Sequence, residues 1–415
     1  MLKSQIIEAN SFTQTRCEFS IPAKLCASMK LAHLGVFGAQ SYLINGQLGQ
    51  TAVIKRITLR QGGTVLSQYD RYFRNYLEFK TLGSGNSYHR NIAKQLKASN
   101  YGMVLNDGGS DVAAIAGVAD APGSGALRPR VCVDKKDLKT TQVAEADAHF
   151  AMLDLAECLG FCNAVYQDGS NQISGVIPCH IFSNLKLQLE FEAPATVAAN
   201  ATTVAQPYLI FNEVEDEPLA QRFMSRSLAA QFSDYELESV FLGTATSSKK
   251  FLNSFYGKTL GNLVYMVDSG QAVPRSYAQG GEVFRLLVNN SNLIQLTTGI
   301  DHPGKKAAFT RMTGSDLTIV SLADRTIPSF PAYNADHNAS ATSLYEGDAN
   351  SASTESEFYT AGTQSYLVLP IQTKIDKLQL DYSRTDVGNI NLLFWAEVGK
   401  VMTFDNMGAV VISYM

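Results

Sequence analysis

The sequence predicts an all-β protein made of two tandem antiparallel sandwiches with a few short helices and long loops. Most segments alternate apolar and polar residues over short spans and end at Gly, Asn, Asp or Ser, which is typical of half-buried antiparallel strands. Helical spacing is confined to a few segments that do not alternate regularly with strands, which argues against a parallel α/β sheet. The chain of 415 residues exceeds the roughly 100 to 200 residues of an ordinary domain.

The predicted strands occur in both halves of the chain. In the first half they are Cys17–Ile21, Val36–Ile44, Ile54–Leu59 and, after a Gly62-Gly63 turn, Thr64–Leu66. In the second half they are Leu263–Val267, Val283–Val288, Leu293–Thr297, Leu317–Leu322 and Ala409–Tyr414. The turn signals between them recur at the spacing expected of sandwiches.

Three helices are expected between the strand blocks. Aromatic residues at helical spacing, from Tyr69 to Leu77, predict a helix over Gln68–Lys80 that ends before a glycine. A stripe of small and apolar residues predicts a second helix over Gln142–Val165. Pro218 is a favoured first-turn residue and predicts a third helix that reaches Gln231.

Two long stretches of small polar residues, Asn106–Arg130 and Pro328–Gln364, are expected to be exposed loops. The first contains Asn106, Asp107 and Asp111, whose oxygen-rich, glycine-bearing pattern makes them candidate calcium ligands. This pattern lacks the full EF-hand spacing and its bidentate Glu, so a plain turn is the favoured interpretation.

An internal repeat relates the two halves. The segment KLQLEF at 186–191 returns as KLQLDY at 377–382, with every position identical or conservative. Upstream, the apolar run 176–178 resembles 367–370, and downstream 209–214 resembles 393–398. A duplication places the boundary just after Val214, which gives units 1–215 and 216–415 with a linker helix at 218–231. Convergent strand patterning is the alternative explanation.

The composition excludes several classes of protein. Only 17% of residues are charged and the net charge is −4, which argues against a protein whose main task is to neutralise nucleic-acid phosphates. No window approaches the roughly 20 apolar residues of a membrane span, and no secretory signal is recognised at the start. The six cysteines are too sparse for a disulfide framework and are expected to be reduced thiols.

The candidate reactive groups have structural interpretations. His149, Cys158 and Cys162 have helical spacing that could suit a metal, but the cysteines are expected in the core. Cys179 and His180 are adjacent beside a strand and so point to opposite faces, which excludes a catalytic pair. The carboxylates Glu213 and Glu397 occupy equivalent repeat positions in different sandwiches. The basic cluster Arg128–Lys139 is interrupted by acidic residues, which favours a solvated surface or a subunit contact. No catalytic residue, cofactor or metal is therefore expected.

In sequence, two features resemble a known family. The stretch Ala52–Phe79, with a strand, glycine turn, short strand and aromatic helix, and the paired strands KLQLEF and KLQLDY are similar to the double jelly-roll major capsid proteins of tailless icosahedral viruses. That lineage includes the coat proteins of tectiviruses and corticoviruses and the adenovirus hexon. The resemblance is architectural, covers the whole chain and rests on no diagnostic motif. It implies two tandem eight-stranded antiparallel jelly-roll sandwiches.

The resemblance also implies a function. A homotrimer would place six jelly rolls in a pseudo-hexameric capsomer of a virion capsid assembled in the host cytoplasm. Its partners would be further copies of itself, neighbouring capsomers, vertex or penton and minor capsid proteins, and an underlying lipid membrane, without sequence-specific nucleic-acid binding. The segment Met1–Ala9 would pack beneath the capsomer as an amphipathic helix, and the long loops would form outward towers.

Two alternatives remain open. One is a two-domain carbohydrate-binding protein or glycoside hydrolase, although the single tryptophan, Trp395, lies in a predicted strand and sugar platforms favour exposed Trp. The other is a viral spike or receptor-binding protein, which shares the sandwiches and tolerates a similar composition.

Overall fold

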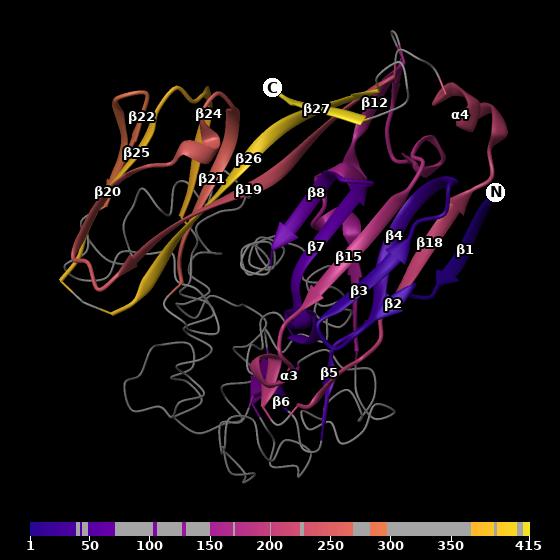
Figure 1. Ribbon diagram of the computed structural model, residues 1–415, viewed down its shortest axis with the longest axis horizontal. Coiled ribbons are helices and arrows are strands. Elements are labelled where there is room, and N and C mark those ends of the chain that lie inside the picture. Colours follow the sequence, from indigo (N-terminus) through magenta and orange to yellow (C-terminus); the bar gives the residue numbers. More distant parts are fainter. Residues whose placement is uncertain are drawn as a thin grey trace.

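Figure 1 shows the computed structural model of the chain, which is dominated by strands gathered into two bodies that lie side by side. The structure describes residues 1–38, 42–43, 49–70, 103–105, 127–129, 150–168, 171–199, 201–224, 228–268, 283–296, 367–385, 388–404 and 410–415.

The first body is a sandwich of two antiparallel sheets. In one sheet the neighbour order is β1-β18-β4-β11, with β14 also paired to β4, and in the other it is β2-β3-β15-β7-β8. The strands of the first sheet are β1 (Leu2–Ile7), β4 (Leu25–Leu34), β11 (Ala151–Asp154), β14 (Ile177–Pro178) and β18 (Tyr208–Val214). Those of the second are β2 (Ser11–Phe12), β3 (Arg16–Ser20), β7 (Ile54–Gln61), β8 (Thr64–Asp70) and β15 (Leu185–Phe191).

The second body repeats this plan. One sheet has the order β13-β12-β19-β26-β21-β24, with β27 also paired to β26, and the other has the order β20-β25-β22-β23. The large sheet contains β12 (Val165–Asp168), β13 (Asn171–Ile173), β19 (Ala229–Gly243), β21 (Thr259–Asp268), β24 (Leu367–Lys374), β26 (Ile390–Phe404) and β27 (Val410–Tyr414). The small sheet contains β20 (Ser247–Phe251), β22 (Val283–Val288), β23 (Ser291–Leu296) and β25 (Leu378–Ser383).

The two bodies share one strand connectivity, which is that of a jelly roll. The order β3-β15-β7-β8 is matched by β20-β25-β22-β23, and β1-β18-β4-β14 is matched by β19-β26-β21-β24. In both bodies the first strand in chain order pairs with the eighth, the eighth with the third and the third with the sixth. The predicted fold class, two tandem eight-stranded antiparallel jelly rolls, is confirmed.

The repeated sequence segments occupy equivalent strands. KLQLEF forms most of β15 and KLQLDY forms most of β25, and each lies between the second and fourth strands of its roll. Both strands alternate strictly between buried and half-buried residues, so the leucines point into the core and the polar residues point outward. The other two matched pairs fall on β14 and β24 and on β18 and β26.

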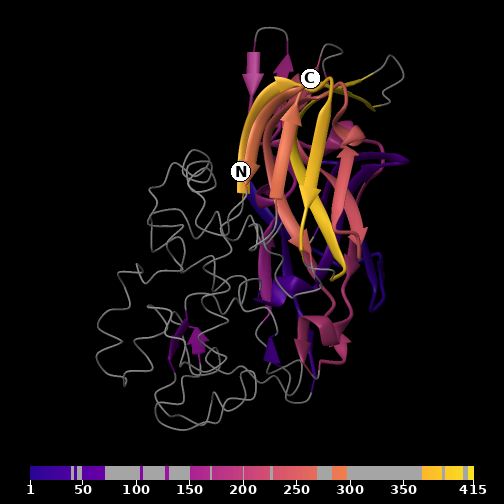
Figure 2. The same cartoon turned by 90° about the vertical axis from the view of Figure 1, so that its left-hand side faces the viewer.

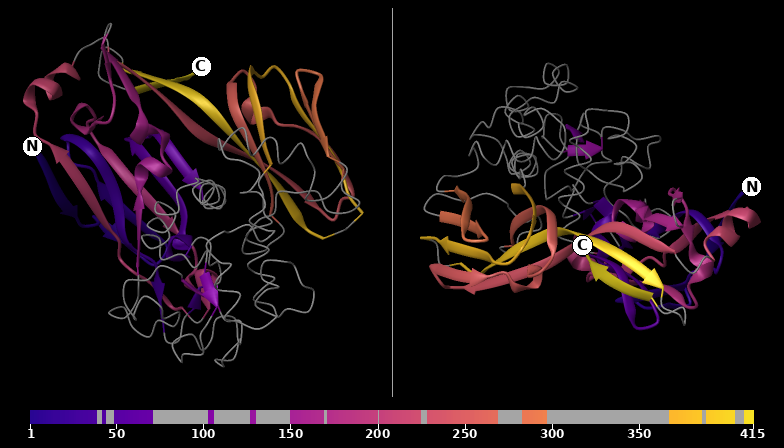
Figure 3. Two further views of the ribbon diagram at one scale, coloured as in Figure 1. Left: turned by 180° about the vertical axis from the view of Figure 1, so that it is seen from behind. Right: turned by 90° about the horizontal axis from the view of Figure 1, so that it is seen from above.

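The two cores meet at the long strands β19 and β26. The first core is built mainly from the first half of the chain, but it also includes Val264, Leu393, Trp395 and Met402. The second core contains Leu392, Phe394 and Ala396 from the same strand β26. Since neighbouring residues of a strand face opposite sides, both faces of β26 are buried at this point. Figure 3 shows β19 and β26 running from the second roll to the first.

Short elements connect the strands. In the described ranges the α-helices are α3 (Pro194–Val197) and α4 (Glu217–Arg222), and the 3₁₀ helices are η1 (Gly49–Val53), η5 (Leu155–Glu157), η6 (Gly160–Asn163), η7 (Cys179–Ile181) and η8 (Asn253–Phe255). Three two-stranded pairs join β5 (Val36–Phe37) to β17 (Thr203–Val204), β6 (Tyr42–Leu43) to β16 (Ala198–Ala199) and β9 (Met103–Leu105) to β10 (Leu127–Pro129). Within the described part of the chain, no helix has the length and hydropathy needed to cross a membrane.

The expected helices are shorter or absent where the structure describes them. Met1–Ala9 is not a helix, because Leu2–Ile7 pairs with β18 as a strand. The linker helix predicted at 218–231 is α4, which ends at Arg222, and Ala229 already begins β19. Residues 151–154 of the helix predicted over Gln142–Val165 pair with β4 instead. Residues 68–70 of Gln68–Lys80 belong to β8. In each case hydrogen bonding to a strand far away in the chain outweighs the helical preference that the spacing of nearby residues indicates.

Most predicted strands match strands of the structure, with shifted ends. Val36–Ile44 is an exception, because only the short strands β5 and β6 occupy it. Leu317–Leu322, Pro328–Gln364 and most of Asn106–Arg130 lie outside the described residues. The chain order places both long stretches between the fifth and sixth strands of their rolls.

Candidate functional site

The cysteines considered as metal ligands are core thiols. Cys158 is buried and Cys162 is half-buried, and they lie at η5 and η6 and not on one face of an α-helix. Burial raises the pKa of Cys162 well above its usual value, whereas a metal binds the thiolate. No group of three His, Cys, Asp or Glu residues in the described ranges is placed to hold a metal ion. His149 lies outside these ranges.

Cys179 and His180 do not form a nucleophile and base pair. They lie in the 3₁₀ helix η7, directly after the strand β14, so they are beside a strand as expected but not on it. A hydrogen bond with the thiol of Cys26, together with burial, raises the pKa of Cys179 well above its usual value. The His180 ring lies against α4, with Nε2 at 2.9 Å from the carbonyl oxygen of Ala220. Both residues therefore support the packing of the first roll.

The two equivalent glutamates have separate structural partners. Glu213 on β18 is 7% exposed, lies 2.6 Å from Lys24 Nζ and accepts a hydrogen bond from Gln5. Glu397 on β26 accepts from Asn262 Nδ2 at 2.9 Å. Each carboxylate thus has partners of its own, Lys24 and Gln5 for Glu213 in the first roll and Asn262 for Glu397 in the second.

Trp395 does not offer a sugar platform, because it is 2% exposed and belongs to the first core. The exposed aromatic side chains of the described residues are Tyr208, Phe241, Phe251, Tyr256 and Tyr414.

A charged network lies on β19 and β26, the long strands that run from the second roll to the first. Lys400 Nζ lies 3.3 Å from Asp234 Oδ2 and 3.5 Å from Glu236 Oε1, and Lys258 Nζ lies 2.5 Å from Glu236 Oε2. Tyr414 of β27 hydrogen-bonds Glu236, and its ring centroid lies 4.2 Å from Lys258 Nζ.

The two carboxyl groups of this network differ in pKa. Burial raises the pKa of Asp234 despite the attraction of Lys400. Burial also acts on Glu236, but hydrogen bonds from Lys258 and Tyr414 outweigh it and lower the pKa of Glu236. The two lysines and the two carboxylates of the network balance one another's charges.

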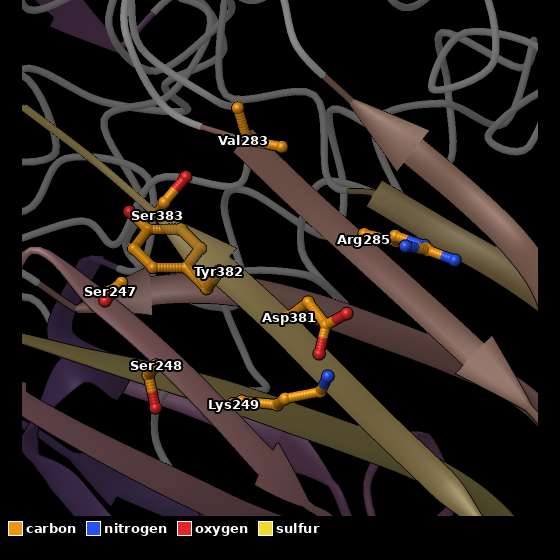
Figure 4. Close-up of a pocket in the computed structure, with 8 residues that line it drawn as sticks. All are labelled: Ser247, Ser248, Lys249, Val283, Arg285, Asp381, Tyr382 and Ser383. Carbon is orange, nitrogen blue, oxygen red and sulfur yellow. The ribbon is translucent and has the colours of Figure 1, made fainter.

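A shallow depression lies on the outer face of the small sheet of the second roll (Figure 4). Its volume is about 430 Å³. Three charged residues that line it, Lys249, Asp381 and Arg285, lie on neighbouring strands, with Asp381 paired to Lys249 on one side and to Arg285 on the other. Ser247, Ser248 and Ser383 line it further. Gln379 Nε2 donates to Asp381 Oδ1 at 2.8 Å. Alternating charge and hydroxyl groups suit polar contact with another surface, and they do not form a nucleophile with an adjacent base.

The outer face of the first sheet is a second open surface, formed by β1, β18 and β4. Ser4 Oγ donates to Asn212 Oδ1 at 2.6 Å, and Asn212 Nδ2 donates to Ser28 Oγ at 2.7 Å, so one polar row crosses three strands. Next to this row, Ile6 pairs with Ile210. Ile6 is 73% exposed and Leu2 is 70% exposed. This face combines apolar side chains with few charges, as interface cores do.

The remaining sequence candidates are not described. Asn106, Asp107 and Asp111 lie outside the described residues, and so do most of Arg128–Lys139. The sequence reasoning missed the network of Asp234 and Lys400, because its members are far apart in the chain. It also missed the exposed edge of β1, although the alternation of Leu2, Ser4 and Ile6 was a usable signal.

No protein-family model matches the sequence, and no curated protein matches it either. In fold, the chain is similar to VP54 of PBCV-1, whose crystal structure was fitted into a cryo-EM reconstruction of the virophage Sputnik. The TM-score is 0.53 at 9% identity, over 100% of this chain and 97% of that chain. It is also similar to a chain of the quasi-atomic model of the PBCV-1 virus capsid, with a TM-score of 0.51 at 10% identity and the same coverage. The likeness shows a shared fold over the whole length.

Proposed function

We propose that this chain is a major capsid protein that builds the shell of an icosahedral virion. The observation that carries the proposal is the likeness in fold to the PBCV-1 capsid chain, which extends over 100% of this chain and 97% of that one. Fold alone hosts many functions. The proposal is therefore also supported by the low charge, 17% of residues, and by open sheet faces with small polar and apolar side chains.

The capsomer of this proposal is a homotrimer. Figure 1 shows the two rolls side by side, and in Figure 2, where the second roll lies in front of the first, its strands run broadly up and down the view. Three copies would therefore arrange six similar rolls around one axis as a pseudo-hexamer. Val264, Leu393, Trp395 and Met402 of the second half pack into the first core, which favours the fixed angle between the rolls that a regular lattice requires.

The protein acts in this proposal as a structural component and not as an enzyme. Its partners are further copies, neighbouring capsomers, vertex and minor capsid proteins and an underlying membrane, and it makes no sequence-specific contact with nucleic acid. Its location is the virion capsid, assembled in the host cytoplasm. The net charge of −4 agrees with a coat that does not itself condense the genome.

The boundary between the two rolls is placed after residue 215 in this proposal. The eighth strand of the first roll ends at Val214, and α4 separates it from β19, the first strand of the second roll. Asp216 caps α4 by accepting from the N–H of Leu219 at 3.0 Å, which starts the connecting helix at a defined residue.

Size-exclusion chromatography with light scattering on the purified chain tests the proposal. We expect a species with three times the chain mass of 45.1 kDa, and pseudo-hexagonal particles in negative-stain electron microscopy. A chain that stays monomeric at micromolar concentration overturns the capsomer proposal. In purified virions the chain should be the most abundant protein band, and a minor band would instead favour a spike.

A further inference from the structure

The second roll packs the outer face of its large sheet against the first roll. Val264 of β21 pairs with Trp395 of β26, and both belong to the first core together with Leu393. Their neighbours Leu392 and Phe394 belong to the second core. Because neighbouring residues of a strand face opposite sides, the first three side chains lie on the outer face of the sheet. The first roll therefore covers part of this face.

The first roll contributes the edge of its second sheet to this contact. β8 is the end strand of the order β2-β3-β15-β7-β8, and β19 of the second roll packs against it. Leu66 and Ser67 of β8 are both 0% exposed, although neighbouring side chains of a strand point to opposite sides. Ser67 lies beside Asp234 of β19. The contact between the rolls thus joins a sheet face to a sheet edge.

The equivalent face and the equivalent edge of the other roll are open. In the first roll, the sheet β1-β18-β4 corresponds to β19-β26-β21, and on its outer face Leu2 is 70% and Ile6 is 73% exposed. In the second roll, the end strand β23 corresponds to β8. The neighbouring residues Asn292 and Leu293 of β23 are both exposed, so both sides of this strand reach solvent there. One such face and one such edge therefore stay unused within a single chain.

The open face and the open edge are alike in chemistry. The outward-facing residues of β1 and β18 are small polar or apolar, with the row of Ser4 and Asn212 beside the pair of Ile6 and Ile210. The exposed start of β23 has the sequence Ser-Asn-Leu. Neither set contains a charged side chain, and charge depletion is typical of interface cores.

We propose that the open face of the first roll in one copy packs against the β23 edge of the second roll in the next copy. The occupant is a second copy of this chain, because the chain already binds an equivalent face to an equivalent edge. Since a face meets an edge, the contact is head-to-tail, and successive copies can close into a ring. This inference rests on the proposed function, because it names the surfaces that hold the trimer together.

The arrangement of the rolls suits such a ring. Figure 1 places β1 at one end of the molecule and β22, the neighbour of β23, at the other, and the left view of Figure 3 shows the same ends from behind. In Figure 1 the first strands of the two rolls, β1 and β19, both start near the top and run downward. A copy added by the same step that relates the two rolls therefore stands the same way up, as copies around a three-fold axis do.

Cross-linking of the full-length chain tests the contact. We expect the double variant Ile6→Cys and Leu293→Cys, treated with a short bismaleimide reagent, to give covalent bands of two and three times the chain mass. Each single variant should give no more of these bands than the unaltered chain, because identical positions do not meet in a head-to-tail contact.

A matched control moves one cysteine to the other edge of the same sheet. It combines Ile6→Cys with Phe251→Cys, since Phe251 is 50% exposed and lies on β20, the end strand opposite β23. The two end strands are roughly 14 Å apart, because neighbouring strands lie about 4.8 Å apart. This control should cross-link far less than the pair of Ile6→Cys and Leu293→Cys.

A second measurement places charge in the contact. Ile6→Glu should raise the dissociation constant of the trimer at least about tenfold in sedimentation experiments, because a charge would be buried without a partner. Adding Leu293→Lys should recover most of this loss by providing an opposite charge across the contact. Tyr256→Glu is the control, because Tyr256 is 70% exposed and lies outside both surfaces. Circular dichroism melting should show every variant folded.

The outcomes separate this inference from the proposed function. A trimer in which the Ile6 and Leu293 pair gives no cross-link, or in which the control with Phe251→Cys cross-links equally well, overturns this contact and leaves the capsid proposal standing. A trimer that Ile6→Glu does not weaken has the same meaning. An unaltered chain that stays monomeric overturns the capsomer, and the contact with it.

Discussion

At the scale of single residues, Glu18 of β3 shows how the outer sheet faces are held. Its carboxylate accepts hydrogen bonds from Lys186 Nζ and Gln188 Nε2, each at 2.6 Å, and Arg60 Nη2 lies 3.3 Å away. The pKa of Glu18 lies below its ordinary value of 4.5, and the hydrogen bond from Lys186 contributes most to this lowering. Three strands are thereby tied at one point.

The lowered pKa of Glu18 predicts a pH dependence of stability. The contribution is fully present above pH 4.5 and is lost as pH falls through the lowered pKa of the folded state. We expect it to be below about 1 kcal/mol, because the site is partly open to solvent. Glu18→Gln should therefore flatten the loss of unfolding free energy below pH 4.5, measured by urea unfolding at several pH values. An unchanged slope would contradict the assignment.

Gly160 of η6 is a second residue with a specific reason for its identity. A Cβ atom there would lie 1.8 Å from the carbonyl oxygen of Ser233, which belongs to β19. This glycine allows the first roll to contact the backbone of the strand that crosses between the rolls.

Gly160→Ala should lower the free energy of unfolding by about 2 kcal/mol or more, because the backbone of β19 must move to relieve the overlap. Gly63→Ala serves as the control, since no atom lies within 4 Å of a Cβ at that position. Thermal unfolding by circular dichroism would compare them. Equal melting temperatures for the two variants would contradict the close approach.

At the scale of elements, β27 closes the junction between the rolls. It pairs only with β26 among the described strands. The carbonyl oxygen of Met415 accepts a hydrogen bond from the N–H of Thr259, and its N–H donates to the carbonyl oxygen of Gly399. Its Tyr414 completes the charged network through Glu236. This terminal strand therefore contributes to the junction through one side chain and several backbone contacts.

Tyr414→Phe should cost about 0.5 to 1.5 kcal/mol of unfolding free energy, because the hydroxyl bond to Glu236 is lost while the ring remains beside Lys258. The exposed Tyr256 provides the matched control, and Tyr256→Phe should leave stability within about 0.5 kcal/mol of the original. Guanidinium unfolding followed by fluorescence measures both. A larger effect from Tyr256→Phe would argue against the role of Tyr414.

At the scale of the whole molecule, the two rolls are related in plan but share their packing. Val264, Leu393, Trp395 and Met402 complete the first core, although they belong to the second half of the chain. Strand β12, from the first half, pairs with β19 of the second. The strand order therefore repeats as two units, whereas the first core contains residues from both halves of the chain.

Separated halves should therefore not fold independently. We expect residues 1–224 alone to lack a cooperative thermal transition, because the surface that receives Trp395 and Leu393 would be exposed. Co-expression with residues 228–415 should restore it. A cooperative transition of the isolated first half, seen by calorimetry, would show that the shared residues are not required.

The sequence by itself determined the strand alternation, the repeat of KLQLEF as KLQLDY and hence the two rolls, because side-chain period and self-similarity are local properties. Tertiary structure alone decided whether Leu2–Ile7 and Ala151–Asp154 became strands, since each pairs with a segment far away in the chain. It also decided that Trp395 completes the first core and that Asp234 meets Lys400. Such contacts depend on how distant strands come together, and no local pattern of residues encodes that.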